Sequence, residues 1–169
     1  MDIKIVDNFM PEDIFSEYSK SIIEIPWSAC SVVYEGDLGC ELLCNKLDNF
    51  MLVHSFYDKN IPASKLYYQF IEPLLSHIQI KSLIRAKVNL NPRTEKIVQH
   101  GYHVDNEFSN SLSSILYLNT NDGYTQFEES GIKVESVANR LITFPNSYFH
   151  TGSTCTNQKY RMTLNLNYF

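Results

Sequence analysis

Apolar residues recur at helical spacing near the start of the chain. Pro11 stands at a first helical position, and the acidic Glu12 and Asp13 suit the positive end of a helix dipole. The apolar positions that follow are spaced to share one side of a helix: Ile14, Phe15, Tyr18 and Ile22. The pattern predicts a helix over residues 11–24.

A second helical pattern runs from about Ala63 to His77, and Pro73 lies inside it. Its apolar positions are Leu66, Tyr67, Phe70, Ile71, Leu74 and Leu75. Proline lacks the backbone N–H and crowds the preceding turn, so we expect one helix with a kink at Pro73. Residues 27–57, between the two patterns, fit neither the helical nor the strand period.

From Leu83 onward the apolar period changes to two, and short extended runs alternate with turn-forming residues. The turns are marked by NP at 91, NDG at 121, SG at 130 and PNS at 145. Closely spaced short strands predict a sandwich or barrel, with the N-terminal helices covering one face. No repeat or long linker divides the chain, so we expect one domain over 1–169, with a helical or mixed support at 1–82 and the core strands at 83–169.

Two of the predicted strands have one wholly polar face. RAKVNLNP places Arg85, Lys87, Asn89 and Asn91 on one side, and YRMTLNLNYF does the same with Arg161, Thr163, Asn165 and Asn167. Such faces suit either a solvated surface or a barrel whose interior is a polar pocket. The pattern alone leaves both open.

Composition narrows the function classes. The formal charge of -5 gives no footprint for nucleic-acid phosphates or anionic lipid, so neither a nucleic acid nor a membrane is an expected partner. Neither a signal peptide nor a membrane-length apolar run is present. The 4 cysteines lack paired CxxC spacing and read as reduced thiols. We therefore expect a soluble, intracellular, cytoplasmic protein.

Candidate metal chemistry lies in the segment GYHVDN. His103 and Asp105 are separated by one residue, so on an extended strand their side chains point the same way, within reach of one ion. His150 follows a turn-like segment and leads toward the polar final strand. Two histidines and one carboxylate on one face of a metal leave positions open, as non-haem Fe(II) requires for a bidentate cosubstrate and O2.

The other histidines read differently. His54 and His77 have no ligand-like neighbour in the sequence and are expected to be structural or surface residues. His100 and His103 form a possible H-x-x-H ligand pair, but on a strand that spacing puts the two side chains on opposite faces.

In order along the chain, HVDN at 103–106, SILYLN at 114–119, NDGYTQF at 121–127 and NRLITFPNSYFHTG at 139–152 are followed by Arg161. This series resembles the HxD...H...R signature of the Fe(II)- and 2-oxoglutarate-dependent dioxygenase superfamily, and within it the prolyl-4-hydroxylase-like branch. The resemblance covers about residues 83–169. It implies a double-stranded β-helix, the jelly-roll barrel shared with cupins.

The resemblance also implies roles for residues. His103, Asp105 and His150 would be the catalytic iron ligands, and Arg161 would pair with the distal carboxylate of 2-oxoglutarate as a planar fork. The remaining candidates for cosubstrate contact are Tyr117, whose hydroxyl would reach the same carboxylate, Asn91, Asn89, Thr163 and Asn165. Gly123 and Gly152 are better explained as turn or close-packing glycines.

The implied reaction converts 2-oxoglutarate and O2 to succinate and CO2 while hydroxylating a C–H bond, with ascorbate supporting activity. Closeness to the prolyl hydroxylase branch favours a protein or peptide residue as substrate, proline first. One alternative is the same chemistry on a free small molecule. A different class is a metal- or sugar-binding jelly-roll module or a cupin-like isomerase, which would not need Arg161. Nucleic-acid demethylation is disfavoured by the acidic balance. Trp27 and the EGDLG segment at 35–39 are either a lid over the iron or a packed tryptophan and an ordinary hairpin.

Overall fold

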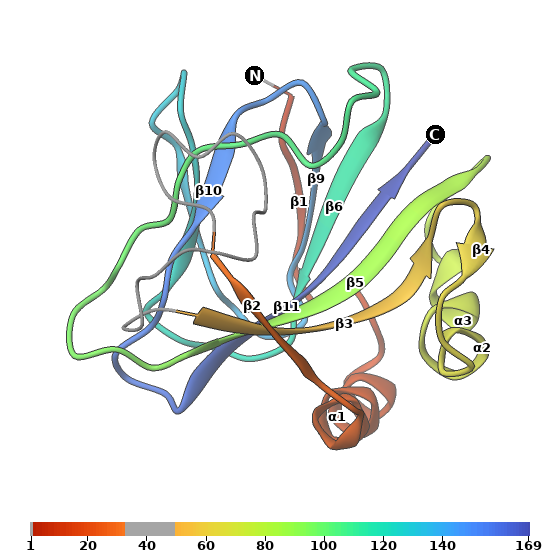
Figure 1. Ribbon diagram of the computed structural model, residues 1–169, viewed down its shortest axis with the longest axis horizontal. Helices are drawn as coiled ribbons and strands as arrows, with labels where there is room; N and C mark the ends of the chain where they lie inside the picture. Colours follow the sequence, from red (N-terminus) through yellow and green to blue (C-terminus); the bar gives the residue numbers. More distant parts are fainter. Residues whose placement is uncertain (1, 33–49) are drawn as a thin grey trace.

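The computed structural model describes residues 2–32 and 50–169, whose strands form two antiparallel sheets (Figure 1). The larger sheet runs, in spatial order, β1 (Lys4–Val6), β9 (Leu141–Pro145), β6 (Leu112–Tyr117), β11 (Tyr160–Tyr168), β5 (Leu83–Pro92), β3 (Phe50–Asp58) and β2 (Ser28–Ser31), with β4 (Ile61–Pro62) paired to β3. The smaller sheet runs β10 (His150–Gly152), β7 (Tyr124–Phe127) and β8 (Lys133–Glu135). The change of period at Leu83 thus marks the start of a strand-rich half, as predicted.

The first helix lies where the sequence predicts it. Helix α1 (Glu12–Ser21) continues into a 3-10 turn, η1 (Ile22–Glu24), and buries Phe15 and Ile22. Two details differ from expectation. Pro11 is the N-cap residue rather than the first helical residue, and Ile14 is 50% exposed, so the buried side of the helix is narrower than its apolar pattern.

The single kinked helix predicted over 63–77 is wrong. Two one-turn helices stand there, α2 (Tyr67–Phe70) and α3 (Glu72–Leu75), with Ile71 between them. Pro73 has no N–H to donate to the carbonyl of Gln69, and its ring crowds that carbonyl, so the hydrogen-bond ladder breaks instead of bending. No helix among the described residues is long and apolar enough to cross a membrane.

The N-terminal part also contributes strands that the sequence pattern did not reveal, chiefly β3. Its pairing with β5 shifts register between Ser55 and Tyr57, as in a β-bulge. A bulge interrupts the alternation of faces, so the apolar period of two is lost there. The EGDLG segment at 35–39 lies outside the described residues.

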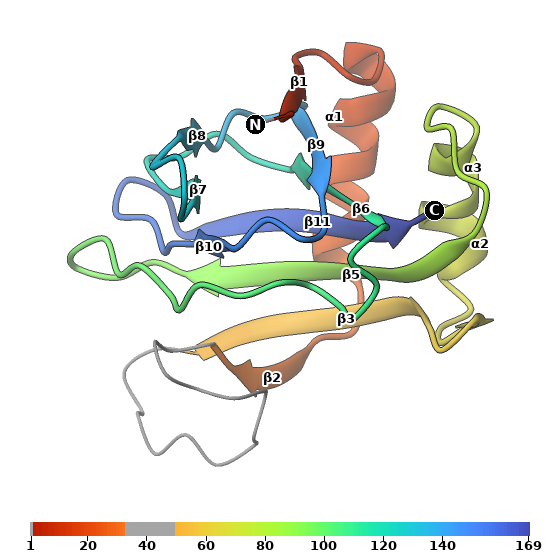
Figure 2. The ribbon, with the colours of Figure 1, turned by 90° about the horizontal axis from the view of Figure 1, so that it is seen from above.

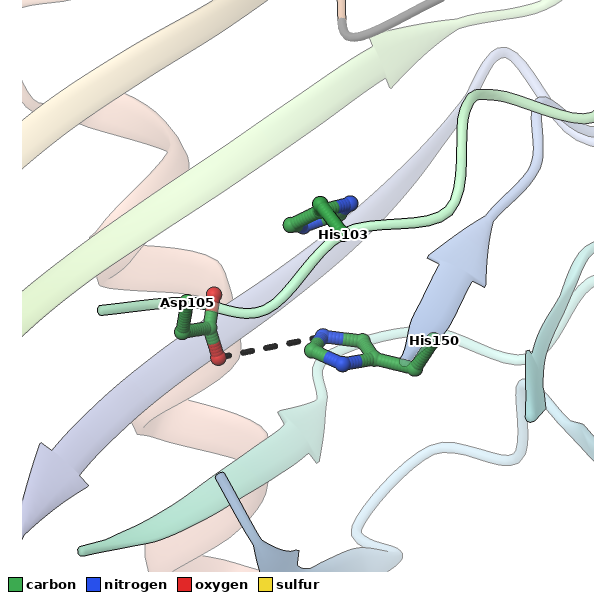
Figure 3. A group of neighbouring side chains, drawn as sticks. All are labelled: His103, Asp105 and His150. Carbon is green, nitrogen blue, oxygen red and sulfur yellow. Dashed lines mark ion pairs between the residues drawn. The ribbon is translucent and has the colours of Figure 1, made fainter. Parts of the chain in front are cut away.

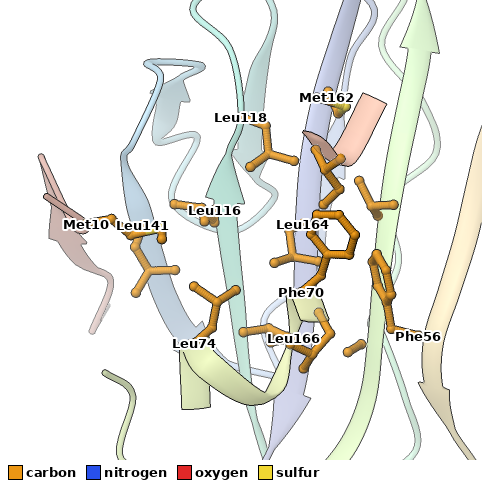
Figure 4. Packing of buried hydrophobic residues seen from close by; sticks show 14 of the residues in the cluster. Met10, Phe56, Phe70, Leu74, Leu116, Leu118, Leu141, Met162, Leu164 and Leu166 are labelled. Carbon is orange, nitrogen blue, oxygen red and sulfur yellow. The ribbon is translucent and has the colours of Figure 1, made fainter. Parts of the chain in front are cut away.

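Apolar side chains form two clusters, one on each face of the large sheet. The first packs the helices against that sheet, and Phe70 and Leu74 meet Leu116, Leu164 and Leu166 in it (Figures 2 and 4). The second lies between the two sheets and joins residues of β6, β7, β8 and β9: Ile115, Tyr117, Phe127, Val134, Ile142 and Phe144. The layers are therefore helices, large sheet and small sheet.

Strands β5 and β11 divide their faces sharply. Their apolar residues belong to the helix-side cluster, whereas the polar residues face the other way and most of them are buried. In the antiparallel register polar residues stand opposite polar residues: Arg161 opposite Asn91, Thr163 opposite Asn89, Asn165 opposite Lys87 and Asn167 opposite Arg85. The polar faces belong to the barrel interior and not to a solvated surface.

Asn139 ties the N-terminal segment to the barrel. Its side chain accepts a hydrogen bond from the Met10 N–H at 2.9 Å and donates one to the Met10 carbonyl at 2.8 Å, and its backbone carbonyl accepts one from Phe9. Asn139 is 1% exposed and has a φ of 63°, in the left-handed region that asparagine tolerates better than alanine does.

We predict that Asn139→Ala lowers the free energy of unfolding by about 2–4 kcal/mol, because it leaves buried backbone groups of Met10 unsatisfied and strains the backbone. The matched control is Asn60→Ala, at an exposed asparagine with a φ of 64°. That change should cost about 1 kcal/mol or less, the backbone contribution alone. Urea denaturation measures both, and equal losses would contradict the role given to the Met10 bonds.

Candidate active site

His103 and His150 are held side by side by their own backbones. The His103 N–H donates to the His150 carbonyl and the His150 N–H donates to the His103 carbonyl, each at 3.0 Å. Their ring centroids lie 4.8 Å apart. His150 begins β10, as predicted for a strand across the barrel, but His103 forms only an isolated bridge and Asp105 lies in a bend, so the predicted strand over 103–105 is wrong.

Both imidazoles are oriented by a backbone carbonyl two residues back. Nδ1 of His103 lies 3.1 Å from the Gly101 carbonyl, and Nδ1 of His150 lies 3.1 Å from the Tyr148 carbonyl. A proton on Nδ1 leaves Nε2 as the metal-binding nitrogen, as is usual for histidine ligands. Burial lowers the pKa of His103, which favours the neutral form that a metal needs.

Asp105 is fixed through both carboxylate oxygens. Arg85 donates to Oδ1 at 2.9 Å, Asn167 donates to Oδ2 at 3.0 Å, and Arg85 Nε donates to Asn167 Oδ1 at 2.9 Å, which closes a ring of three side chains. Burial alone would raise the pKa of Asp105, but electrostatic interaction with His150 and Arg85 holds it below its ordinary value. Asp105 therefore stays ionised although its side chain is only 3% exposed.

The three candidate ligands converge from different parts of the chain (Figure 3). Asp105 Oδ2 lies 3.8 Å from Nε2 of His150, and the possible ligand atoms of His103, Asp105 and His150 all lie within 4.8 Å of one another. Two imidazole nitrogens and one carboxylate are the donor set that non-haem Fe(II) takes on one face. These residues thus fit such a metal.

A cavity of about 470 Å³ opens beside this group. Its wall includes the polar faces of the two long strands, with Arg85, Lys87, Asn89 and Asn91 from β5 and Arg161, Thr163 and Asn165 from β11. Thr163 Oγ1 donates to Asn165 Oδ1 at 3.1 Å. The structure therefore brings the predicted metal ligands and most of the predicted cosubstrate residues to one cavity.

Arg161 is a buried cation, 4% exposed. Its Nε donates to Ser136 Oγ at 2.7 Å and its Nη2 donates to Thr125 Oγ1 at 3.0 Å, and both acceptors are neutral. No carboxylate within residues 2–32 or 50–169 forms an ion pair with it. A buried guanidinium without an anion is costly, so this site fits an anionic ligand.

The glycines near Arg161 are close-packing residues. A Cβ on Gly123 would lie 2.6 Å from Arg161 Cδ, and a Cβ on Gly152 would lie 3.3 Å from Arg161 Nη1. Tyr117 is fully buried and donates its hydroxyl to Thr125 Oγ1 at 2.8 Å, so it reaches the cavity wall through Thr125. Its direct contact with a cosubstrate stays a prediction.

Several groups in the wall lack partners among the described residues. Buried polar atoms without a hydrogen bond include Asn89 Oδ1, Asn91 Nδ2 and His100 Nε2, all from residues that line the cavity. Buried polar groups in native proteins are nearly always paired. A polar cosubstrate bound here would supply such partners, which is a second respect in which the residues fit 2-oxoglutarate.

The remaining histidines and Trp27 lie apart from the ligand group. His54 contacts the Pro26 carbonyl at 2.7 Å, and His77 packs edge-on against Phe9. Trp27 packs against the helix-side core and donates to the Ile23 carbonyl, as expected of a packed tryptophan. His100 is not part of the metal group, but it does line the cavity.

Sequence reasoning did not identify the Arg85–Asn167 clamp on Asp105, nor Thr125, Ser136 and His100 beside Arg161. Arg85 and Asn167 were recognisable as members of the polar faces, but their meeting depends on the register of β5 and β11. Thr125 was visible only as part of a short strand. No local spacing marks these contacts.

No family pattern matches the sequence, and no curated protein matches it. Solved structures do match. A 2OG-Fe(II) oxygenase family oxidoreductase from Burkholderia pseudomallei aligns with a TM-score of 0.69 at 13% identity, over 98% of this chain and 84% of that one.

Two further structures are similar. A prolyl hydroxylase from Trichoplax adhaerens, in complex with a hypoxia inducible factor peptide, aligns with a TM-score of 0.62 at 16% identity over 99% of this chain and 83% of that one. The α-ketoglutarate-dependent epimerase SnoN from nogalamycin biosynthesis aligns with a TM-score of 0.64 at 12% identity over 99% and 78%.

These alignments extend over nearly the whole chain, beyond the 83–169 range of the sequence resemblance. They confirm the predicted double-stranded β-helix. At such identities the likeness shows the fold shared with 2-oxoglutarate oxygenases, including prolyl hydroxylases, and the function has to be argued from the site.

We predict that His150→Ala and His103→Ala each weaken Mn(II) binding by at least about 100-fold, because loss of a ligand should exceed the 10- to 100-fold cost of losing a residue that only supports one. His77→Ala, at an exposed histidine outside the group, is the control and should bind Mn(II) as the wild type does. Electron paramagnetic resonance of free Mn(II) gives the affinities. Wild-type affinity in His150→Ala would remove that residue from the ligand set.

Proposed function

We propose that this protein is an Fe(II)- and 2-oxoglutarate-dependent dioxygenase that hydroxylates a C–H bond of a protein or peptide residue, with proline as the first candidate. One observation carries the proposal. The same cavity holds a His-Asp-His group suited to Fe(II) and a buried arginine with no acidic partner among the described residues. A metal-binding module would explain the first feature but not the second.

Each part of the site has a distinct task. His103, Asp105 and His150 would hold the metal from one side, with Arg85 and Asn167 keeping the carboxylate in place. Arg161 would bind the distal carboxylate of 2-oxoglutarate, and Thr125 keeps its guanidinium oriented. When bound, iron and 2-oxoglutarate supply the oxidation, in which O2 and 2-oxoglutarate yield succinate, CO2 and one oxygen atom for the substrate C–H bond.

The cavity mouth supports an apolar target group. Val104 and Phe149 line the cavity and remain 36% and 47% exposed, so they form a hydrophobic rim beside the metal ligands. A proline ring in a peptide suits such a rim. The likeness to a prolyl hydroxylase solved with a peptide supports the same class. A free small molecule is the second candidate, supported by the likeness to the epimerase SnoN.

Two further expectations belong to the proposal. Ascorbate should sustain turnover by keeping the iron reduced. A reducing, cytoplasmic location is the second expectation, since the spacing of the cysteines in the sequence is not that of a disulfide scaffold.

The decisive assay measures succinate. Purified protein with Fe(II), ascorbate, O2 and 2-oxoglutarate should release succinate, and proline-containing peptides should raise the rate of release above the level seen without substrate. Each hydroxylated peptide should gain about 16 mass units, the mass of one oxygen atom, and about one peptide should be hydroxylated for each succinate formed. The His150→Ala protein serves as the inactive control.

If a pool of metabolites but not the peptides raises the rate of succinate release, the proposed substrate becomes a free small molecule. If the iron-loaded protein releases no succinate with any of the peptides or metabolites, the dioxygenase function itself is contradicted.

A further inference from the structure

His100 lies at the junction of the cavity wall and the small sheet. Its N–H donates to the Gly152 carbonyl at 3.0 Å, and its carbonyl accepts a hydrogen bond from Thr151 Oγ1 at 2.8 Å. These bonds fix the backbone of His100 against β10, the strand that begins with His150. His100 lines the same cavity as Arg161.

The imidazole of His100 and the guanidinium of Arg161 both lie beside Gly152. A Cβ on Gly152 would lie 3.3 Å from Arg161 Nη1 and 4.0 Å from His100 Nδ1, so both groups border the space left by that glycine. Burial, followed by the charge of Arg161, lowers the pKa of His100 to about 4. The ring is therefore neutral at physiological pH and able to donate one hydrogen bond without adding charge.

One nitrogen of this ring has no partner. His100 Nε2 is buried and makes no hydrogen bond within the described part of the chain. Leaving a buried polar atom unsatisfied is destabilising, so a buried histidine retained for stability alone would normally be paired. Because His100 lines the same cavity as Arg161, a ligand bound by Arg161 would supply the partner that Nε2 lacks.

We propose that His100 is a cosubstrate-binding residue that donates a hydrogen bond from Nε2 to the distal carboxylate of 2-oxoglutarate, beside Arg161. The inference rests on the proposed function and adds a residue to it. Arg161 already donates hydrogen bonds from Nε to Ser136 and from Nη2 to Thr125. A carboxylate has about four lone-pair sites, so a further donor next to the guanidinium would complete its recognition.

Calorimetric titration of Mn(II)-loaded protein tests this role, since Mn(II) retains the ligand set without turnover. His100→Leu should weaken 2-oxoglutarate binding by roughly 10- to 100-fold, the range for losing one bond to a charged group. The same variant should bind 2-oxopentanoate, which has the same 2-oxo acid end but no distal carboxylate, within about two-fold of the wild type. His100→Gln, whose amide keeps a donor, should recover part of the affinity.

His54 provides a matched control, because its Nε2 is also buried without a partner and His54 is not part of the cavity wall. His54→Leu should bind both acids as the wild type does. Thermal melting adds a readout independent of affinity. The Tm of ligand-free His100→Leu should equal or exceed that of the wild type, since an unsatisfied polar atom is removed, while the rise caused by 2-oxoglutarate should shrink.

An equal loss of affinity for both acids would place the effect at the metal end and overturn the proposal, as would unchanged 2-oxoglutarate affinity in both His100 variants. If His100→Leu does not fold, a His100→Gln protein that binds 2-oxoglutarate more weakly but 2-oxopentanoate within about two-fold of the wild type supports the proposal, whereas unchanged affinity or an equal loss for both acids overturns it. Failure of the wild type to bind 2-oxoglutarate at all would instead refute the proposed function.

Discussion

The structure depends on the burial of a polar surface. Strands β5 and β11 place their apolar residues against the helices and turn their polar residues into the space between the sheets. Buried polar groups must be paired, and a buried cation needs an anion. Thr163 and Asn165 satisfy one another in part, whereas the acceptors that Arg161 meets among the described residues are neutral. The interior is therefore organised for a polar, anionic ligand and not for close apolar packing.

The metal end of the cavity follows the same rule in a different way. There the buried carboxylate of Asp105 is fully compensated by Arg85 and Asn167, which come from adjacent strands of the large sheet. The register of β5 and β11 places Arg85 opposite Asn167, and these two side chains hold Asp105. The position of this candidate metal ligand is therefore determined by the pairing of the barrel strands. The other end of the cavity, around Arg161, has no such internal compensation among the described residues. The candidate metal ligands are therefore held in place before any ligand binds, whereas the region around Arg161 would be completed by a bound carboxylate.

Much of this arrangement was predictable from sequence. The period of two after Leu83, the polar faces of two strands and the ordered HVD, HTG and arginine positions are local patterns, and they identified the fold and the residues that meet in the cavity. The interruption at Ile71 was partly visible, since Pro73 was recognised but its effect was underestimated. Strand β3 was hidden by its bulge. The Arg85 clamp and the position of His100 depend on register and on a close approach at Gly152, which a single sequence does not encode locally.

The central claim is that Arg161 recognises an anion that binds together with the metal. Anaerobic titration of the Fe(II)-loaded protein with 2-oxoglutarate tests it most directly, with Arg161→Ala compared against Arg93→Ala, an exposed arginine that is not part of the cavity wall. The Arg161 variant should lose about 2–5 kcal/mol of cosubstrate binding, roughly 30-fold to several thousand-fold, with metal affinity unchanged. The Arg93 variant should behave as the wild type does. Equal affinity of the Arg161→Ala protein and the wild type for 2-oxoglutarate would contradict the account.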